Sequence, residues 1–562
     1  MDRSTAELIQ CSKRYYLGKR KGMAISMTRE KKVFVYTIII GFLTHAFRMT
    51  NTMICSDTTN YLKSIGVSWV ISLGRILLPI VEKIRGTVEL PFLIGTICLV
   101  LIGGAAVFIV RLFDIRENIF LVIIAWILAA NPVVTSIFAY MYTADGYMIS
   151  LLFSVLAAYL CLKKKGLSGS LLGGLCLAVS LGFYQAFLSV TIIIMLFYLF
   201  RMLYTSEYDM KEIGKMTGRC LLSGVTGVAV YAIGVMIVWK AGGYQAADYM
   251  GMDSAGATGI HGLLQAVIDC YVDFARFYIV RWELNRYNVM NVLMFLLTLI
   301  TWLVLVTKRK LWRMPIRVVL MALVFPLLPI VCHLFEFVSA GVSYTSTSME
   351  YSLALVYLLL VIVWNDMQHS VSAQNTNMEK PEDPKKAAGI AEKFRWTDLQ
   401  YWKRHYLSML SVVLLLCISF HFTVIANRSY YNMNNANTKM EMLLNRLVMR
   451  MEMTEGYHED MEIAIYGSCY ETPEYVPAAP IMSGVVSNIF LTQDNEYIRM
   501  MNHYLSTNYG RADFEIKCQI AATEEFATME PWPSENSIRI IDGIMVLYLS
   551  DTNIKQYLPQ EE

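Results

Sequence analysis

The stretch YTADGYMISLLFSVLAAYL, residues 142–160, places one Asp among tyrosines and then continues without any charged residue. Crossing the hydrocarbon core of a bilayer takes about 20 mainly apolar residues in a helix. The stretch therefore predicts a membrane helix, at 146–162, with a polar island at one end. Apolar segments of similar length recur along the chain, and their recurrence predicts an α-helical, polytopic membrane protein.

The whole chain has the composition of an integral membrane protein. Of its 562 residues, 56% are hydrophobic and only 17% are charged, whereas soluble domains carry about a quarter charged residues. The formal net charge of +3 is too close to zero to indicate a nucleic-acid partner. Eleven segments approach the length of a span: 33–50, 89–110, 118–138, 146–162, 168–183, 186–203, 219–239, 288–306, 316–334, 351–365 and 406–425.

The distribution of Lys and Arg predicts the orientation of these spans. Basic residues gather on the cytoplasmic side of membrane proteins, and alternate loops here contain clusters such as KKK at 163–165. The intervening loops at 139–146, 184–185 and 335–350 contain neither Lys nor Arg. We therefore expect a multi-pass protein of the cell membrane with a cytoplasmic N-terminus and an extracytoplasmic C-terminus.

This orientation divides the chain into five parts. They are a basic cytoplasmic N-terminus (1–32), a transmembrane domain with long external loops at 51–88 and 240–287 (33–365), a cytoplasmic linker (366–405), a last span (406–425) and an extracytoplasmic α/β domain (426–562). In the last part the patterns predict helices near 436–453 and 494–505, and strands at 461–467, 514–518 and 538–549. Amphipathic segments in the two long loops predict helices that lie in the membrane interface.

An acidic residue in the first external loop suggests chemistry. Asp57 stands in ICSDTTNYL, residues 54–62, just beyond the first span. In an inverting glycosyl transfer, a carboxylate removes the proton of the acceptor hydroxyl while a phosphate leaves the sugar. Asp57 fits that base, and Arg75 or Arg85 in the same loop fits the phosphate, because guanidinium binds phosphate oxygens in bidentate fashion. The alternative is that Asp57 caps a short helix.

Three further polar residues are candidates for a substrate cavity. Asp145 is flanked by tyrosines that could stack on a sugar ring, but Tyr is also common at membrane interfaces, and Asp145 could equally cap a helix. Tyr184 and Gln185 form the polar break in a long apolar run, which we interpret as an external turn. Their side chains could contact substrate or simply satisfy the turn. No HExxH or similar spacing occurs, so the sequence predicts no metal site, and a divalent ion at the leaving phosphate stays open.

Several motifs resemble a known family. The external Asp57, SLGRILLP (72–79), YTADGYMISLLFSVLAAYL (142–160) and LAVSLGFYQAFLSV (177–190) are similar to the bacterial integral-membrane glucosyltransferases of the Gtr type II group, which modify O-antigen and other surface glycans. The resemblance is good over roughly the first 200 residues and covers only the layout of the later spans. Relatives carry a second acidic residue beside the first, whereas Thr58 follows here.

The resemblance implies a GT-C type fold and a polyprenyl-phosphate-linked hexose, glucose by preference, as donor. The acceptor would be a cell-surface glycan or a teichoic-acid-like polymer outside the membrane. Carried over by position, Asp57 would be the general base, Arg75 a phosphate contact, and Asp145, Tyr184 and Gln185 members of the cavity.

Two other functions remain as alternatives. A transporter or flippase for a lipid-linked glycan would call for inverted repeats and polar residues near the midplane of the membrane. A non-enzymatic partner in polymer assembly would act through the C-terminal domain, although an anchor would need one span rather than eleven.

Overall fold

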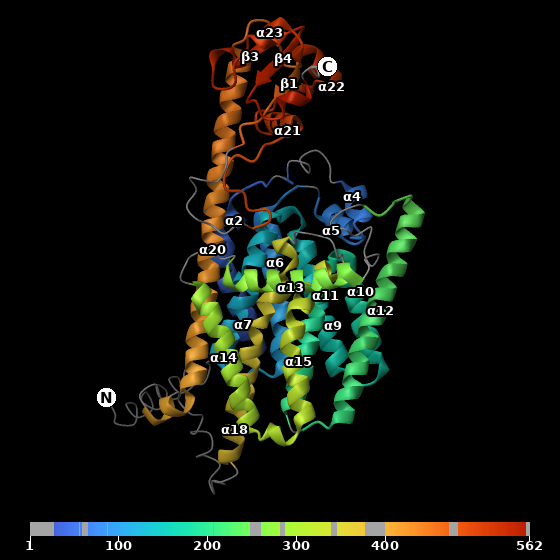
Figure 1. Cartoon of the computed structure of the whole chain (residues 1–562), viewed down its shortest axis with the longest axis vertical. Helices are drawn as coiled ribbons and strands as arrows, with labels where there is room; N and C mark the ends of the chain where they lie inside the picture. Colours follow the sequence, from blue (N-terminus) through green and yellow to red (C-terminus); the bar gives the residue numbers. More distant parts are fainter. Residues whose placement is uncertain are drawn as a thin grey trace, which may run out of the picture.

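The computed structural model is a helical bundle with a small domain standing on one end (Figure 1). One long helix, α20 (Leu399–Glu452), runs along the side of the bundle and into that domain. The structure describes residues 27–55, 57–58, 66–86, 88–205, 207–247, 260–280, 287–338, 346–376, 399–470 and 482–557.

Within these ranges ten helices are long and apolar enough to cross a membrane, as a polytopic membrane protein requires. They are formed by α2 (Arg29–Thr50), α6 (Pro91–Phe113), α7 with α8 (Asn118–Ala130, Pro132–Ala139), α9 (Met141–Lys163), α11 (Leu188–Tyr204), α12 (Met210–Gly242), α14 (Tyr287–Lys308), α15 (Pro315–Cys332), α17 with α18 (Tyr351–Val356, Leu358–Thr376) and α20. The remaining predicted span, 168–183, is α10 (Leu167–Phe183), whose 17 residues are at the short limit for a crossing. All eleven predicted segments are therefore helical.

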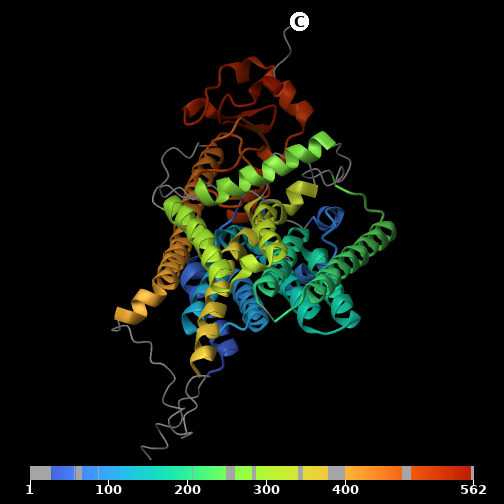
Figure 2. The ribbon, with the colours of Figure 1, turned by 60° about the horizontal axis from the view of Figure 1, so that its bottom comes forward.

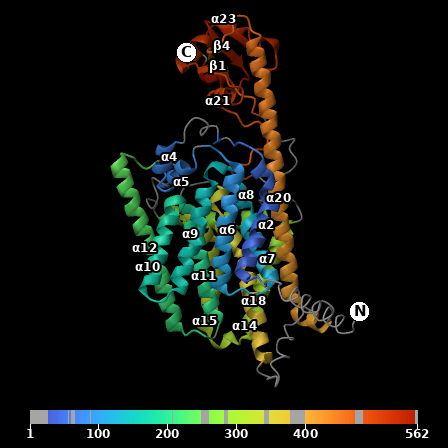
Figure 3. The same cartoon turned by 180° about the vertical axis from the view of Figure 1, so that it is seen from behind.

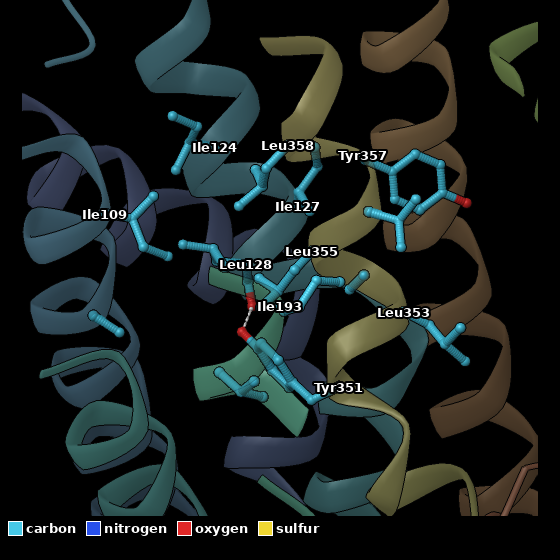
Figure 4. Packing of buried hydrophobic residues seen from close by; sticks show 14 of the residues in the cluster. Ile109, Ile124, Ile127, Leu128, Ile193, Tyr351, Leu353, Leu355, Tyr357 and Leu358 are labelled. Atoms are coloured by element: carbon cyan, nitrogen blue, oxygen red, sulfur yellow. Dashed lines mark hydrogen bonds between the residues drawn. The ribbon is translucent and has the colours of Figure 1, made fainter. Parts of the chain in front are cut away.

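Helices α17 and α18 form the centre of the bundle. In the span Tyr351–Gln368, 94% of the residues are buried, against 17% in α12, which lies at the edge. Figure 4 shows Leu355 close to Leu128 of α7, and the Tyr351 hydroxyl donates a hydrogen bond of 2.7 Å to the Leu128 carbonyl. This bond satisfies the buried hydroxyl, so the tyrosine ring can pack among apolar side chains at little cost.

A histidine ties α20 to the bundle. The two ring nitrogens of His45 on α2 lie 2.7 Å from the Tyr430 hydroxyl on α20 and 2.8 Å from the Ala129 carbonyl on α7. Because His45 is fully buried, these bonds replace the water that both ring nitrogens would otherwise need. The contact fixes the helix that carries the C-terminal domain.

Both long loops contain helices in their described parts. The first loop forms α4 (Val67–Ser72) and α5 (Leu78–Arg85), which Figure 3 places at the end of the bundle that faces the C-terminal domain. The second contains α13 (Ile260–Ile279), which crosses the bundle instead of running along it (Figures 1 and 2). α16 (Leu334–Val338) leads out of α15. The two loops are thus helical in much of their described part, residues 61–65 and 281–284 of the expected segments lie outside the described residues, and placement in a membrane interface stays a prediction.

The C-terminal domain is a small mixed sheet with helices. The strands β1 (Glu462–Tyr466), β2 (Gly510–Arg511), β3 (Ile538–Ile541) and β4 (Ile544–Tyr548) lie in the order β2-β1-β4-β3. Strand β1 is parallel to both of its neighbours, while β3 and β4 form an antiparallel hairpin. The helices are α21 (Asp494–Tyr504), α22 (Phe514–Ala521) and α23 (Glu524–Ala527).

Two predictions for this domain need correction. Residues 514–518 begin helix α22 instead of forming a strand, because their alternating pattern is also compatible with a helix that buries Lys517, Ile520 and Ala521. The predicted strand 538–549 is a hairpin, turned at Asp542 and Gly543, which both have positive φ. The helix predicted near 436–453 is confirmed, and it is continuous with the last span in α20.

Candidate active site

A cavity of about 610 Å³ lies between the end of the bundle and the C-terminal domain. Its walls come from the α4–α5 loop, the start of α9, the turn after α10, the short helix η3 (Thr347–Met349) and α21. Among the described residues that line it, Asp57, Arg75 and Arg499 carry charge. The aromatic lining residues are Trp69, Tyr140, Tyr142, Tyr147 and Tyr184.

A tight turn between α4 and α5 positions Arg75. Gly74 has φ +77°, and a Cβ there would lie 2.5 Å from the Tyr231 hydroxyl and 2.8 Å from the side-chain nitrogen of Gln185. Gln185 donates hydrogen bonds to the Leu73 carbonyl at 2.7 Å and to the Tyr231 hydroxyl at 2.9 Å. Gln185 does not line the cavity. It instead holds the turn that carries Arg75.

The Arg75 guanidinium rests on two stacked tyrosines. Its Nη1 donates to the Tyr147 hydroxyl at 2.9 Å, and its central carbon lies 5.6 Å and 5.0 Å from the ring centroids of Tyr147 and Tyr184. The two rings are 3.9 Å apart and nearly parallel, at 14°. The Tyr184 hydroxyl lies 3.0 Å from Ser348 Oγ. Cation–π contact and a hydrogen bond together fix the direction of the guanidinium without cancelling its charge.

Asp57 lies at the mouth of the cavity, with its side chain exposed. The surrounding protein still removes part of the hydration of its carboxylate, and this raises the pKa of Asp57. The negative charge of Glu496, on α21, raises that pKa further. Both effects make the Asp57 carboxylate a stronger base than an ordinary aspartate.

Asp145 and Arg85 form a buried ion pair outside the cavity. Arg85 Nε lies 2.8 Å from Asp145 Oδ2, and the two side chains are 6% and 2% exposed. Asp145 is inside α9 rather than at its N-cap, so the capping alternative is wrong. Of the six predicted site residues, Asp57, Arg75 and Tyr184 therefore line the cavity, while Asp145, Arg85 and Gln185 do not.

Glu82 is a second buried carboxyl group near this ion pair. Its side chain is 1% exposed, and neither carboxyl oxygen has a hydrogen-bond partner in the described part of the chain. Burial raises the pKa of Glu82 to about 7; the negative charge of Asp145 adds to this, while Arg85 and Arg75 oppose it. Glu82 follows Leu78 by four residues, which places both on the buried side of α5. In the sequence, this spacing of four residues is the feature that could have indicated that Glu82 is buried.

Arg499 is a cavity residue that the sequence does not reveal. It lies on α21, and even the nearest other lining residue in the sequence, Met349, precedes it by the spans of α17 with α18 and of α20. No local motif connects it to Asp57 or Arg75, so only the folded chain brings the three together. Ser346 and Ser348, in a polar segment without basic residues, also line the cavity.

The described residues contain no group of three or more His, Cys, Asp or Glu side chains that could hold a metal ion. Among the described lining residues, the charged groups are one carboxylate and two guanidinium groups.

Comparison with known protein families gives a match over most of the transmembrane part. The family model described as glucosyl transferase GtrII matches residues 46–364, which is more than half of the chain and includes every lining residue except Arg499. No curated protein and no solved structure gave a significant match. The matched range agrees with the resemblance carried by the SLGRILLP, ADGYM and GFYQ motifs. The chain belongs to the GtrII family of glucosyl transferases.

Proposed function

We propose that this membrane glucosyltransferase moves glucose from a polyprenyl-phosphate donor to a surface glycan or teichoic-acid-like polymer on the outer side of the membrane. The observation that supports this most directly is the cavity, in which a carboxylate of raised basicity and a fixed guanidinium stand at one end of an apolar bundle. A lipid-linked donor needs such a place, because its chain must stay in the bilayer while its headgroup reaches water.

In this reaction Asp57 acts on the acceptor and Arg75 acts on the leaving phosphate. Asp57 accepts the proton of the acceptor hydroxyl, and the oxygen of that hydroxyl forms a bond to the anomeric carbon of glucose. The bond from this carbon to the phosphate oxygen breaks, its electron pair remains on the phosphate, and the configuration inverts. The leaving polyprenyl phosphate gains one negative charge, which Arg75 stabilises through charge-assisted hydrogen bonds. Tyr147 and Tyr184 hold Arg75 in place for this task.

The role of Asp57 can be tested directly. Asp57→Asn keeps the size of the side chain but cannot accept a proton at neutral pH. Since general-base catalysis contributes roughly 10²–10⁴-fold, we expect at least about a hundredfold loss of kcat. The measurement is transfer of label from polyprenyl-phospho-[¹⁴C]glucose to envelope glycan from cells that lack this protein.

Asp542→Asn is the matched control, because Asp542 is exposed in the β3–β4 turn, where Asn is equally suitable. It should retain wild-type activity. Full activity in Asp57→Asn, at normal expression, would remove Asp57 from the mechanism.

A further inference from the structure

The C-terminal domain lies outside the family match yet is attached to the rim of the cavity. Ser136 donates a hydrogen bond of 2.7 Å to the Ser483 carbonyl, and the Thr347 backbone N–H donates one of 3.0 Å to Ser483 Oγ. Gly484, with φ +80°, packs against Tyr140, and a Cβ there would lie 2.7 Å from that ring. These contacts fix the position of the domain above the cavity.

A second attachment lies beside Asp57. The Ile54 backbone N–H donates to Asn437 Oδ1 at 3.0 Å, and Asn437 Nδ2 donates back to the Ile54 carbonyl at 3.1 Å. Asn437 is on α20, just below the domain, and Ile54 packs into the hydrophobic core of the domain. The loop that carries Asp57 is thus held against the C-terminal domain.

Helix α21 presents one face to the cavity. Tyr497, Met500 and Met501 are buried in the core of the domain, so the helical repeat turns Glu496 and Arg499 away from that core. Arg499 lines the cavity, and the charge of Glu496 acts on Asp57. Figure 1 shows α21 as the part of the domain that faces α4 and α5.

We propose that α21 forms the acceptor side of the active site and that Arg499 binds oxygen atoms of the acceptor glycan next to Asp57. This inference rests on the proposed function. The two arginines enter the cavity from different directions. Arg75 lies on the α4–α5 turn among Val70, Leu73 and Leu78, the apolar side that suits a lipid phosphate. Arg499 comes from the domain beyond the bundle, on the side of the base, where the acceptor hydroxyl must stand.

The test separates acceptor binding from donor binding. Purified full-length protein is given polyprenyl-phospho-[¹⁴C]glucose and envelope glycan from cells that lack this protein. Three quantities are measured: KM for the glycan, KM for the donor, and release of free glucose to water without glycan. We expect Arg499→Ala to raise the glycan KM by about tenfold or more, as for loss of a charged hydrogen bond, and to leave donor KM and glucose release within about twofold.

Two further variants complete the test. Arg499→Lys keeps the charge and should give an intermediate glycan KM. Arg539→Ala removes a half-buried arginine of β3 that bonds only Thr528 and Asn536 among the described residues and lies at the opposite end of the domain from α21; it should change none of the three quantities. If Arg499→Ala also loses glucose release, Arg499→Lys decides: a raised glycan KM with intact glucose release supports the inference, and any other result overturns it.

The outcomes also distinguish this inference from the proposed function. An unchanged glycan KM in Arg499→Ala, or an equal rise in donor KM, overturns the acceptor role while glucosyl transfer by the wild type stands. Absence of transfer by the wild type overturns both.

Discussion

At the scale of single residues, the most unusual group is the carboxyl of Glu82, which is buried without a hydrogen-bond partner among the described residues. Its pKa is raised from the ordinary value of 4.5 to about 7, chiefly by burial. Between these two pH values the folded protein keeps a proton on Glu82 that the unfolded chain has released. The free energy of unfolding therefore falls as the pH rises from about 5 through 7.

Glu82→Gln should remove this pH dependence. The neutral amide imitates the protonated acid, so the variant should unfold at about the same temperature as the wild type at pH 5 and at a higher temperature at pH 8. The shift in pKa corresponds to about 3 kcal/mol. Thermal unfolding in detergent at the two pH values measures the difference. Equal unfolding temperatures of the two proteins at pH 8 would show that Glu82 is not destabilising when charged.

At the scale of elements, the site depends on a glycine in the segment that attaches the C-terminal domain. Gly484 has φ +80° and no room for a Cβ beside Tyr140 and Ala139. Gly484→Ala should combine backbone strain with a steric clash and so loosen the domain from the bundle. We expect faster proteolytic release of the C-terminal domain and at least about a tenfold loss of glucosyl transfer, because acceptor positioning then fails.

Gly543→Ala is the matched control. Gly543 also has positive φ, +77°, but nothing lies within 4 Å of its Cβ position. It therefore carries the backbone strain without the clash, and should keep both the protease resistance and the activity. Similar behaviour of the two variants would assign the effect to strain alone.

Elements with a strong hydrophobic pattern were predictable, and the corrections fall where the pattern is ambiguous. The eleven apolar runs became helices because a membrane span has few other ways to satisfy its backbone. The polar break at Tyr184 and Gln185 is a turn, as predicted. The strand predicted at FEIKC (514–518) was wrong, because five alternating residues do not distinguish a strand from the first turn of a helix.

The site was predictable where a polar or charged residue stands out in a loop or a turn, as Asp57, Arg75 and Tyr184 do. Asp57 and Arg75 share one long loop, and both line the cavity. Asp145 and Arg85 were also candidates for the cavity, but they pair with each other outside it. Arg499 could not be predicted as a cavity residue from the sequence, because its place depends on how α20 positions the C-terminal domain relative to the bundle.

At the scale of the whole molecule, the proposed chemistry depends on which side of the membrane the cavity faces. The cavity and the C-terminal domain are at one end of the bundle, and the basic turn between α14 and α15, KRKLWRMPIR (308–317), is at the other (Figure 1). Positive residues favour the cytoplasm, so we expect the cavity to open outside, where a surface glycan can reach it.

Labelling of single exposed positions tests this orientation. Glu525→Cys on the C-terminal domain should react with a membrane-impermeant maleimide in intact cells, whereas Arg313→Cys in the basic turn should react only after the cells are opened. The unsubstituted chain gives the background from its own thiols. The opposite pattern would place Asp57 and the cavity in the cytosol, and transfer to a surface glycan would then have no route to its acceptor.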